Sequence, residues 1–457
     1  MACRREPGSF RDRNNRVFYQ DGRVLRGVSA VALKDWQALS ASEFFPAMTR
    51  AAKVIPTKRV QEPELGTWDA VLEHEAVPFL SYPYEWPFGM LKDAALLHLE
   101  LMQAALREGM ILKDSSAYNI QWLGAQPTFI DITSFVRLPA GEPWVGYRQF
   151  CSMFLYPLML QAYRNAAFQP WMRGSLDGIA SEEFNRILGL RDLWRPGVLS
   201  HVFLQAKLQG SMSTRAVKRE LQSAGFPKEL IVSNVRKLQD LISGLEWRQA
   251  RSQWSEYAAN NTYSAPENDQ KAAFVRGAVI SKRWRRVWDL GCNTGAYSRI
   301  AAENADYVVS MDADQLAVER FYQALKKEGR RSILPLVNNL VDPSPNLGWR
   351  GLERKSLPER GKPDLTLCLA LIHHVVLSAN VPLREFIGWL AELKTAVVIE
   401  FVSKEDPMVK LLLQNKTDDY ADYDQQSFER YLGESFVVSK RQELETGTRT
   451  LYFAAPR

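Results

Sequence analysis

The stretch Val287–Ser298, VWDLGCNTGAYS, decides how the C-terminal part of the chain folds. A short apolar run leads into a turn that contains Gly291 and Gly295, and a helix-like segment follows. This order is typical of a strand that ends in a tight turn at the start of a helix. In open sheets of parallel strands, ligands bind outside the carboxyl ends of the strands. The turn therefore marks a candidate binding site.

Strands and helices alternate around this turn, from about residue 271 to the end of the chain. The expected strands are Arg286–Asp289, Tyr307–Met311, Ser332–Val337, Asp364–Ile372, Ala396–Val402, Ser435–Gln442 and Thr448–Ala455. The expected helices are Thr294–Ala305, Asp314–Glu328 and Pro382–Leu393. Such alternation predicts an α/β fold with a Rossmann-like, doubly wound sheet of seven strands. The short turn Thr446–Gly447 predicts that the last two strands form an antiparallel hairpin at one edge.

The glycine spacing and the acidic residue Asp289 distinguish this turn from a dinucleotide site. The dinucleotide fingerprint is GxGxxG, whereas this turn reads GxxxG. Asp289 lies two positions before Gly291, where a carboxylate would repel a pyrophosphate and suit a cationic or amino-bearing group. Asp312 ends the next strand, where a carboxylate accepts hydrogen bonds from ribose hydroxyls. Asp289 and the glycine spacing point away from NAD and towards S-adenosylmethionine, which carries an ammonium and a sulfonium.

Residues 286–457 resemble class I S-adenosylmethionine-dependent methyltransferases. The resemblance rests on the segments Asp289–Gly295 (DLGCNTG), Asn339–Asp342 (NLVD) and Leu369–Val375 (LALIHHV), together with Asp312. It implies S-adenosyl-L-methionine as the cofactor and a set of cofactor-binding residues: Asp289, Gly291, Cys292, Asn293, Gly295, Asp312, Ala313, Asn339, Leu340, Leu369 and Ala370. A Rossmann-like domain with a dead or repurposed pocket is the alternative interpretation.

Two adjacent histidines, His373 and His374, end the fourth expected strand beside the position that the resemblance implies for the methyl group. An imidazole titrates near neutral pH, so either residue could take a proton from a hydroxyl or amine acceptor. The alternative is that one histidine only packs or shapes the pocket. Glu400 is a second candidate polar group or, alternatively, a solvated residue at a strand end. The acidic run Asp419–Asp424 is interpreted as surface, with the mouth of a substrate site as the alternative.

The N-terminal region contains a second, less specific pattern in residues 111–135. The order of Asp114, Asn119 and Asp131 resembles the catalytic loop and metal-binding Asp of protein-kinase-like phosphotransferases. That resemblance implies that Asp114 orients a hydroxyl nucleophile while Asn119 and Asp131 hold magnesium. No GxGxxG loop is present and no VAIK-like lysine can be assigned. Three readings stay open: an active kinase-like domain, a degenerate one kept for binding or scaffolding, and coincidence, because Asp and Asn are common in turns.

The distribution of β-like and helical sequence patterns along the chain predicts three parts. Residues 1–170 form an α+β accessory domain that is kinase-like, with β-like runs such as Phe129–Phe135 and a helix at Lys92–Glu108. Residues 171–270 form a helical connecting region, with helices at Ala216–Ala224 and Lys228–Glu246, that ends in a polar boundary loop, Asn260–Asp269. Residues 271–457 form the methyltransferase domain. The whole layout resembles bacterial proteins related to a nodulation host-specificity protein.

The composition is that of an ordinary soluble protein, with 457 residues, 46% apolar and 24% charged residues, and a net charge of +6. Four cysteines without a CxxC motif predict no metal site and a reducing compartment. The polar N-terminus does not resemble a secretory signal, and the apolar stretches are too short to span a bilayer, so we expect a cytoplasmic protein without membrane contact.

We therefore expect methyl transfer to a small-molecule or glycan-type acceptor. One alternative is an RNA methyltransferase, for which the basic segments Lys282–Arg286 and Lys326–Arg331 are candidate contacts. Another alternative is a bifunctional protein whose N-terminal part is a kinase-like phosphotransferase or a scaffold. The acceptor atom and the oligomeric state cannot be read from the sequence.

Overall fold

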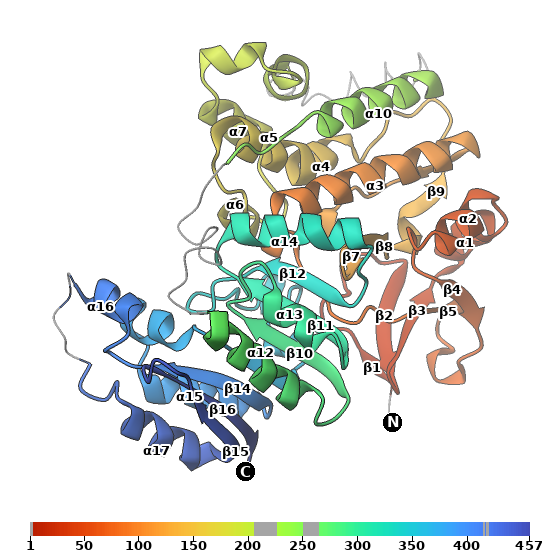
Figure 1. The fold of residues 1–457 in the computed structure, drawn as a ribbon. Coiled ribbons are helices and arrows are strands. Elements are labelled where there is room, and N and C mark those ends of the chain that lie inside the picture. Colours follow the sequence, from red (N-terminus) through yellow and green to blue (C-terminus); the bar gives the residue numbers. More distant parts are fainter. Residues whose placement is uncertain (1–2, 205–225, 250–264, 415, 417–419) are drawn as a thin grey trace. The chain divides into compact units, whose positions relative to one another are not determined.

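The computed structural model describes residues 3–204, 226–249, 265–414, 416 and 420–457. The chain divides into two units (Figure 1). Unit 1 consists of Met1–Trp122, Pro127–Gln249 and Asn346–Arg354, and unit 2 of Leu123–Gln126, Ala250–Pro345 and Lys355–Arg457. The predicted functional boundaries near residues 170 and 270 stay predictions.

Unit 2 is built on a sheet of seven strands in the order β12-β11-β10-β13-β14-β16-β15. The strands are β10 (Trp284–Leu290), β11 (Ala305–Asp312), β12 (Ile333–Val337), β13 (Leu365–Cys368), β14 (Ala396–Val402), β15 (Phe436–Glu443) and β16 (Arg449–Pro456). The first five run parallel, whereas β16 is antiparallel to both of its neighbours. The predicted α/β fold and the antiparallel edge hairpin are confirmed, and the strand order reverses direction between β10 and β13.

The helices of unit 2 are α12 (Ala265–Val279), α13 (Ala296–Ala301), α14 (Gln315–Glu328), α15 (Leu383–Glu392), α16 (Pro407–Leu413) and α17 (Gln425–Ser435). Asp314 caps α14, because its carboxylate accepts the backbone N–H groups of Leu316 and Ala317. All seven residues of β14 are buried, as expected for a strand that is covered on both faces.

Three predicted elements of unit 2 are corrected. The expected strand Asp364–Ile372 ends at Cys368, because Ala370 has a left-handed backbone (φ +50°) that breaks the ladder. The expected helix Thr294–Ala305 shortens to α13, since Gly295 has φ +81° and does not yet belong to the helix. In the expected loop Asn260–Asp269, the part from residue 265 onward is the first turn of α12, and residues 260–264 lie outside the described residues.

Unit 1 begins with an antiparallel sheet in the order β1-β2-β3-β5-β4. Its strands are β1 (Arg4–Arg5), β2 (Asn15–Gln20), β3 (Arg23–Val28), β4 (Thr57–Val60) and β5 (Ala70–His74), and the helices α1 (Ala30–Ser40) and α2 (Phe44–Arg50) lie between β3 and β4 in the chain. This sheet supplies the α+β character that the sequence predicts for residues 1–170.

A helical part follows, which starts with the largely buried helix α3 (Phe88–Arg107). The other elements are β6 (Met110–Leu112), β7 (Ile120–Leu123), β8 (Gln126–Phe129), β9 (Phe135–Arg137), α4 (Tyr147–Phe150), α5 (Tyr156–Arg164), α6 (Gln169–Gly174), α7 (Ser181–Ile187) and α10 (Lys228–Ser243). The expected strand Phe129–Phe135 is wrong, because a helical turn at Ile132–Ser134 separates β8 from β9. The expected helix Ala216–Ala224 lies outside the described residues.

The helices in the described parts of both units fall short of what a membrane span needs, because none of them combines the required length with the required apolar character.

Replacing Gly295 with alanine is expected to destabilise the protein by about 2–4 kcal/mol. A Cβ at Gly295 would lie 1.9 Å from a ring atom of Phe321 in α14, and the φ of +81° strains any residue with a side chain. The free energy of unfolding in urea measures the effect. The matched control is Gly388→Ala in α15, where a Cβ meets nothing within 4 Å and helix propensity predicts a gain of about 0.5–1 kcal/mol. Equal stability of Gly295→Ala and the wild type would contradict this assignment.

Candidate functional site

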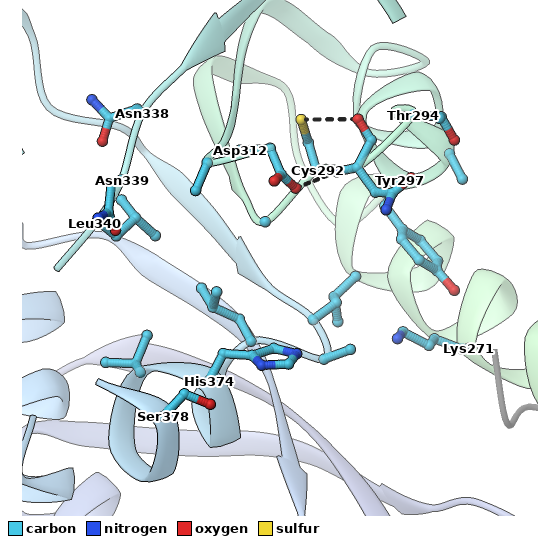
Figure 2. Close-up of a pocket in the computed structure, with 18 of the residues that line it drawn as sticks. Lys271, Cys292, Thr294, Tyr297, Asp312, Asn338, Asn339, Leu340, His374 and Ser378 are labelled. Carbon is cyan, nitrogen blue, oxygen red and sulfur yellow. Dashed lines mark hydrogen bonds between the residues drawn. The ribbon is translucent and has the colours of Figure 1, made fainter. Parts of the chain in front are cut away.

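A pocket of about 790 Å³ lies at the carboxyl ends of the parallel strands of unit 2 (Figure 2). Its size is in the range that holds a cofactor-sized molecule. Most of the residues that the sequence singled out line it, among them Gly291, Cys292, Asn293, Asp312, Ala313, Asn339 and Leu340.

 Leu369, Ala370 and His374 complete this set on the pocket wall. The structure thus brings the three segments of the methyltransferase resemblance together around one cavity.

Asp312, at the end of β11, presents its carboxylate to this pocket. Its Oδ2 accepts the backbone N–H of Asn293 at 2.8 Å, and its Oδ1 accepts the N–H of Asp314 at 2.9 Å. Burial raises the pKa of Asp312 above its ordinary value, while these backbone hydrogen bonds lower it. The glycine turn is held beside it, because the N–H groups of Gly291 and Cys292 both donate to the carbonyl of Met311. A carboxylate has further lone pairs, so Asp312 can accept hydrogen bonds from a ligand.

Three predicted residues lie behind the wall rather than on it. Asp289 is buried and accepts a hydrogen bond from the Ser298 hydroxyl at 2.5 Å, which ties β10 to α13. Gly295 faces the ring of Phe321 and so allows α13 and α14 to pack closely. His373 is fully buried, and neither of its ring nitrogens has a hydrogen-bond partner among the described residues.

His374 lines the pocket at the start of a π-helical turn, His374–Ser378. Its ring lies 4.1 Å from that of His373, measured between ring centroids. Burial, and then the charge of Arg449, lower the pKa of His374 to about 4. Burial also lowers the pKa of His373, and both imidazoles are therefore neutral at physiological pH. A neutral His374 can accept a hydrogen bond from a ligand in the pocket.

The sequence analysis missed Lys271 of α12, which also lines the pocket (Figure 2). Its ammonium lies 2.7 Å from Oε2 of Glu400, and both side chains are almost completely buried. The ammonium also lies 5.0 Å from the centre of the Tyr297 ring, another pocket residue. No pattern pointed to Lys271, because its partner is distant in sequence and α12 begins inside the expected boundary loop.

Glu400 joins several parts of the site. Its Oε2 also accepts the backbone N–H of Ala370 at 2.7 Å, and its Oε1 lies 3.6 Å from a guanidinium nitrogen of Arg449. Arg449 pairs in turn with Asp406 at 2.7 Å. Buried charges of opposite sign therefore alternate from Lys271 to Asp406, and each compensates its neighbour.

Asn338 is a further pocket residue that the sequence analysis missed. It directly follows β12, and its buried amide oxygen has no hydrogen-bond partner among the described residues. A buried polar atom without a partner is costly, so a ligand donor at this position would be favourable. Its position immediately before the predicted Asn339 is the signal that could have found it.

Comparison with known proteins places the chain in a family. No protein-family model matches it. It is 34% identical over 457 residues to nodulation protein NoeA of Rhizobium meliloti strain 1021, and the match covers 98% of this chain and 95% of that protein. The chain belongs to the NoeA family.

Solved methyltransferase structures are similar to part of the chain. One is the N-methyltransferase NodS of Bradyrhizobium japonicum WM9, with 13% identity, a TM-score of 0.32, and coverage of 42% of this chain and 99% of NodS. Another is magnesium protoporphyrin IX methyltransferase of Synechocystis PCC 6803, with 17% identity, a TM-score of 0.30, and coverage of 42% of this chain and 84% of that protein. Independently of these, unit 2 has the Rossmann-like sheet that the resemblance to class I methyltransferases implies.

The contribution of Asp289 to the stability of the protein is expected to fall as the pH rises from 4 to 6. Burial raises its pKa from 3.8 to about 6, so over this range the folded state keeps a proton that the unfolded state loses. The loss amounts to about 3 kcal/mol. Asp289→Asn should remove this contribution, which urea unfolding at several pH values measures. The exposed Asp306→Asn serves as the control, and parallel pH profiles for Asp289→Asn and the wild type would contradict the expectation.

Proposed function

We propose that this chain is an S-adenosylmethionine-dependent methyltransferase whose cofactor occupies the pocket of unit 2. The observation that carries the proposal is the placement of the Asp312 carboxylate beside the Gly291 turn, in the same pocket as the amide oxygen of Asn338, which has no hydrogen-bond partner in the part of the chain that the structure describes. Figure 2 shows Asn338 and Leu340 towards one side of the pocket, Asp312 in the middle, and Tyr297 and Lys271 towards the other.

The residues present fit the parts of this cofactor. The Asn338 oxygen is an acceptor for the exocyclic amino group of adenine, and apolar side chains such as Leu340 and Leu369 can contact the base. The Asp312 carboxylate is an acceptor for ribose hydroxyls. The ammonium of Lys271 is a partner for the carboxylate of the amino acid part.

The bound cofactor would supply an electrophilic methyl group on a sulfonium. The chain binds and orients the reactants in a partly enclosed pocket, which is the main contribution of a protein to such a transfer. His374 is neutral and lines the pocket, so its imidazole can accept the acceptor's proton. Its lowered pKa makes it a weak base, which suits an acceptor that needs little activation.

We further propose a small-molecule or glycan-type acceptor. Polar, uncharged groups such as Asn268 and Ser378 line the pocket and can hydrogen-bond to hydroxyls. RNA is not favoured, because Lys271 is the one cation among the described pocket residues and the proposal assigns it to the carboxylate of the cofactor. The basic segments Lys282–Arg286 and Lys326–Arg331 are absent from the described pocket wall. A cytoplasmic location belongs to the proposal and is consistent with four free cysteines.

The wild-type protein is expected to bind S-adenosylhomocysteine in a calorimetric titration, and Asp312→Ala to weaken this binding by about 10- to 100-fold. The reason is the loss of hydrogen bonds between a charged acceptor and the ribose. Asp306→Ala, at an exposed position near the start of the same strand, should bind like the wild type. The absence of binding by the wild type would refute the proposed function.

Lys271→Met is expected to weaken binding of S-adenosylhomocysteine by about 10-fold or more and to leave binding of 5′-methylthioadenosine unchanged. The second ligand lacks the amino acid part, so it has no carboxylate for Lys271. Lys271→Arg keeps the charge and should retain most of the affinity, and the exposed Lys327→Met is the control. An equal loss of affinity for both ligands would contradict the assignment of Lys271 to the carboxylate.

A further inference from the structure

Unit 1 brings together the three residues for which the kinase-like resemblance implies roles. The side chain of Asn119 hydrogen-bonds to Asp114, and its amide also donates to the Ser134 hydroxyl at 3.3 Å. The Ser134 hydroxyl donates in turn to Oδ2 of Asp131 at 2.5 Å. Burial, and then the charge of Asp131, raise the pKa of Asp114. Asp114, Asn119 and Asp131 therefore form one polar cluster, although they lie on different turns of the chain.

A cation from the N-terminal sheet already occupies this cluster. A guanidinium nitrogen of Arg26, on β3, lies 2.6 Å from Oδ1 of Asp131, and the side chains are 10% and 20% exposed. The Thr133 hydroxyl donates to the same oxygen at 2.9 Å. Burial raises the pKa of Asp131, but Arg26 and the hydroxyl groups outweigh this effect and lower it. Both carboxylate oxygens of Asp131 thus have donors from the chain itself.

Arg26 is held in this position by other strands of the sheet. The nitrogen that contacts Asp131 also donates to the Asn15 side-chain oxygen at 3.0 Å, from β2. The Nε of Arg26 donates to Nε2 of His74 at 3.2 Å, from β5. His74 can accept because burial and the charge of Arg26 lower its pKa to about 3, and its Nδ1 contacts the Thr57 hydroxyl at 2.9 Å. The guanidinium is therefore fixed from several sides and is not a mobile surface group.

The contacts of Asp131 bear on magnesium binding. In protein kinases, an Asp at this position holds magnesium through its carboxylate oxygens, and magnesium requires closely placed oxygen ligands. Here the positively charged guanidinium of Arg26 contacts Oδ1 of Asp131, and the Ser134 hydroxyl donates a hydrogen bond to Oδ2 of Asp131. A divalent cation at Asp131 would meet the repulsion of Arg26 and would have to displace it.

We propose that Arg26 is a resident cation that takes the place of a divalent metal at Asp131, and that unit 1 is a kinase-like module that does not bind magnesium–nucleotide. This inference is independent of the proposed methyltransferase activity. It favours the binding or scaffolding reading of the N-terminal part over the phosphotransferase reading.

The test is a titration of the full-length protein with Mn²⁺, followed by electron paramagnetic resonance of the free ion. Arg26→Gln removes the charge and is expected to bind Mn²⁺ at least about 10-fold more tightly than the wild type. Arg23→Gln is the matched control, since Arg23 lies on the same strand and pairs with Glu62 and Glu73 instead. Adding Asp131→Asn to Arg26→Gln should abolish the gain, which assigns the gained site to the cluster.

Two results would overturn the proposal. One is binding of Mn²⁺ or magnesium–ATP by the wild type, removed by Asp131→Asn. The other is a folded Arg26→Gln protein, judged by circular dichroism, without any gain in Mn²⁺ affinity. If Arg26→Gln does not fold, the magnesium–ATP titration of the wild type decides, because the proposal requires that this titration shows no binding that depends on Asp131.

Discussion

The buried carboxylate of Glu400 is the constraint on which the pocket of unit 2 depends. It pairs with Lys271 from α12, approaches Arg449 from β16, and accepts the backbone N–H of Ala370 in the turn after β13. Elements from both ends of unit 2 therefore meet at one side chain of β14. Burying such charges is favourable only when each one is compensated, so the position of each partner is strictly limited. The contacts with Glu400 therefore fix the positions of Lys271 and Ala370 in the wall of the pocket.

The parts of the site that could be predicted from sequence are local. The Gly291 turn follows a strand directly, and Asp312 ends the next strand, so strand periodicity alone brings them to one edge of the sheet. Lys271 could not be predicted in this way, because an ion pair between distant residues leaves no spacing signal. For Asp289, the sequence predicts an acidic residue next to the turn. It does not predict that this carboxylate is buried and accepts a hydrogen bond from the Ser298 hydroxyl instead of lining the pocket.

In unit 1, too, the local pattern was visible in the sequence, whereas the long-range contact was not. Asp114, Asn119 and Asp131, for which the sequence resemblance implies related roles, lie in one polar cluster. The partner of Asp131 could not be predicted, because the pairing of β3 with β2 and β5 decides where Arg26 lies. The strand order of a sheet is set by long-range packing, and sequence patterns carry little information about it.

The lack of partners around His373 has a consequence for where a proton can go. His374 contacts His373 on its inner side, and no described residue beyond accepts a hydrogen bond from the His373 ring. A chain of hydrogen bonds leading inward from His374 through His373 is therefore missing from the described part of the site. Under the proposed function, a proton that a substrate gives up at His374 would therefore not pass on through His373, and the mouth of the pocket is a route by which it could reach bulk water.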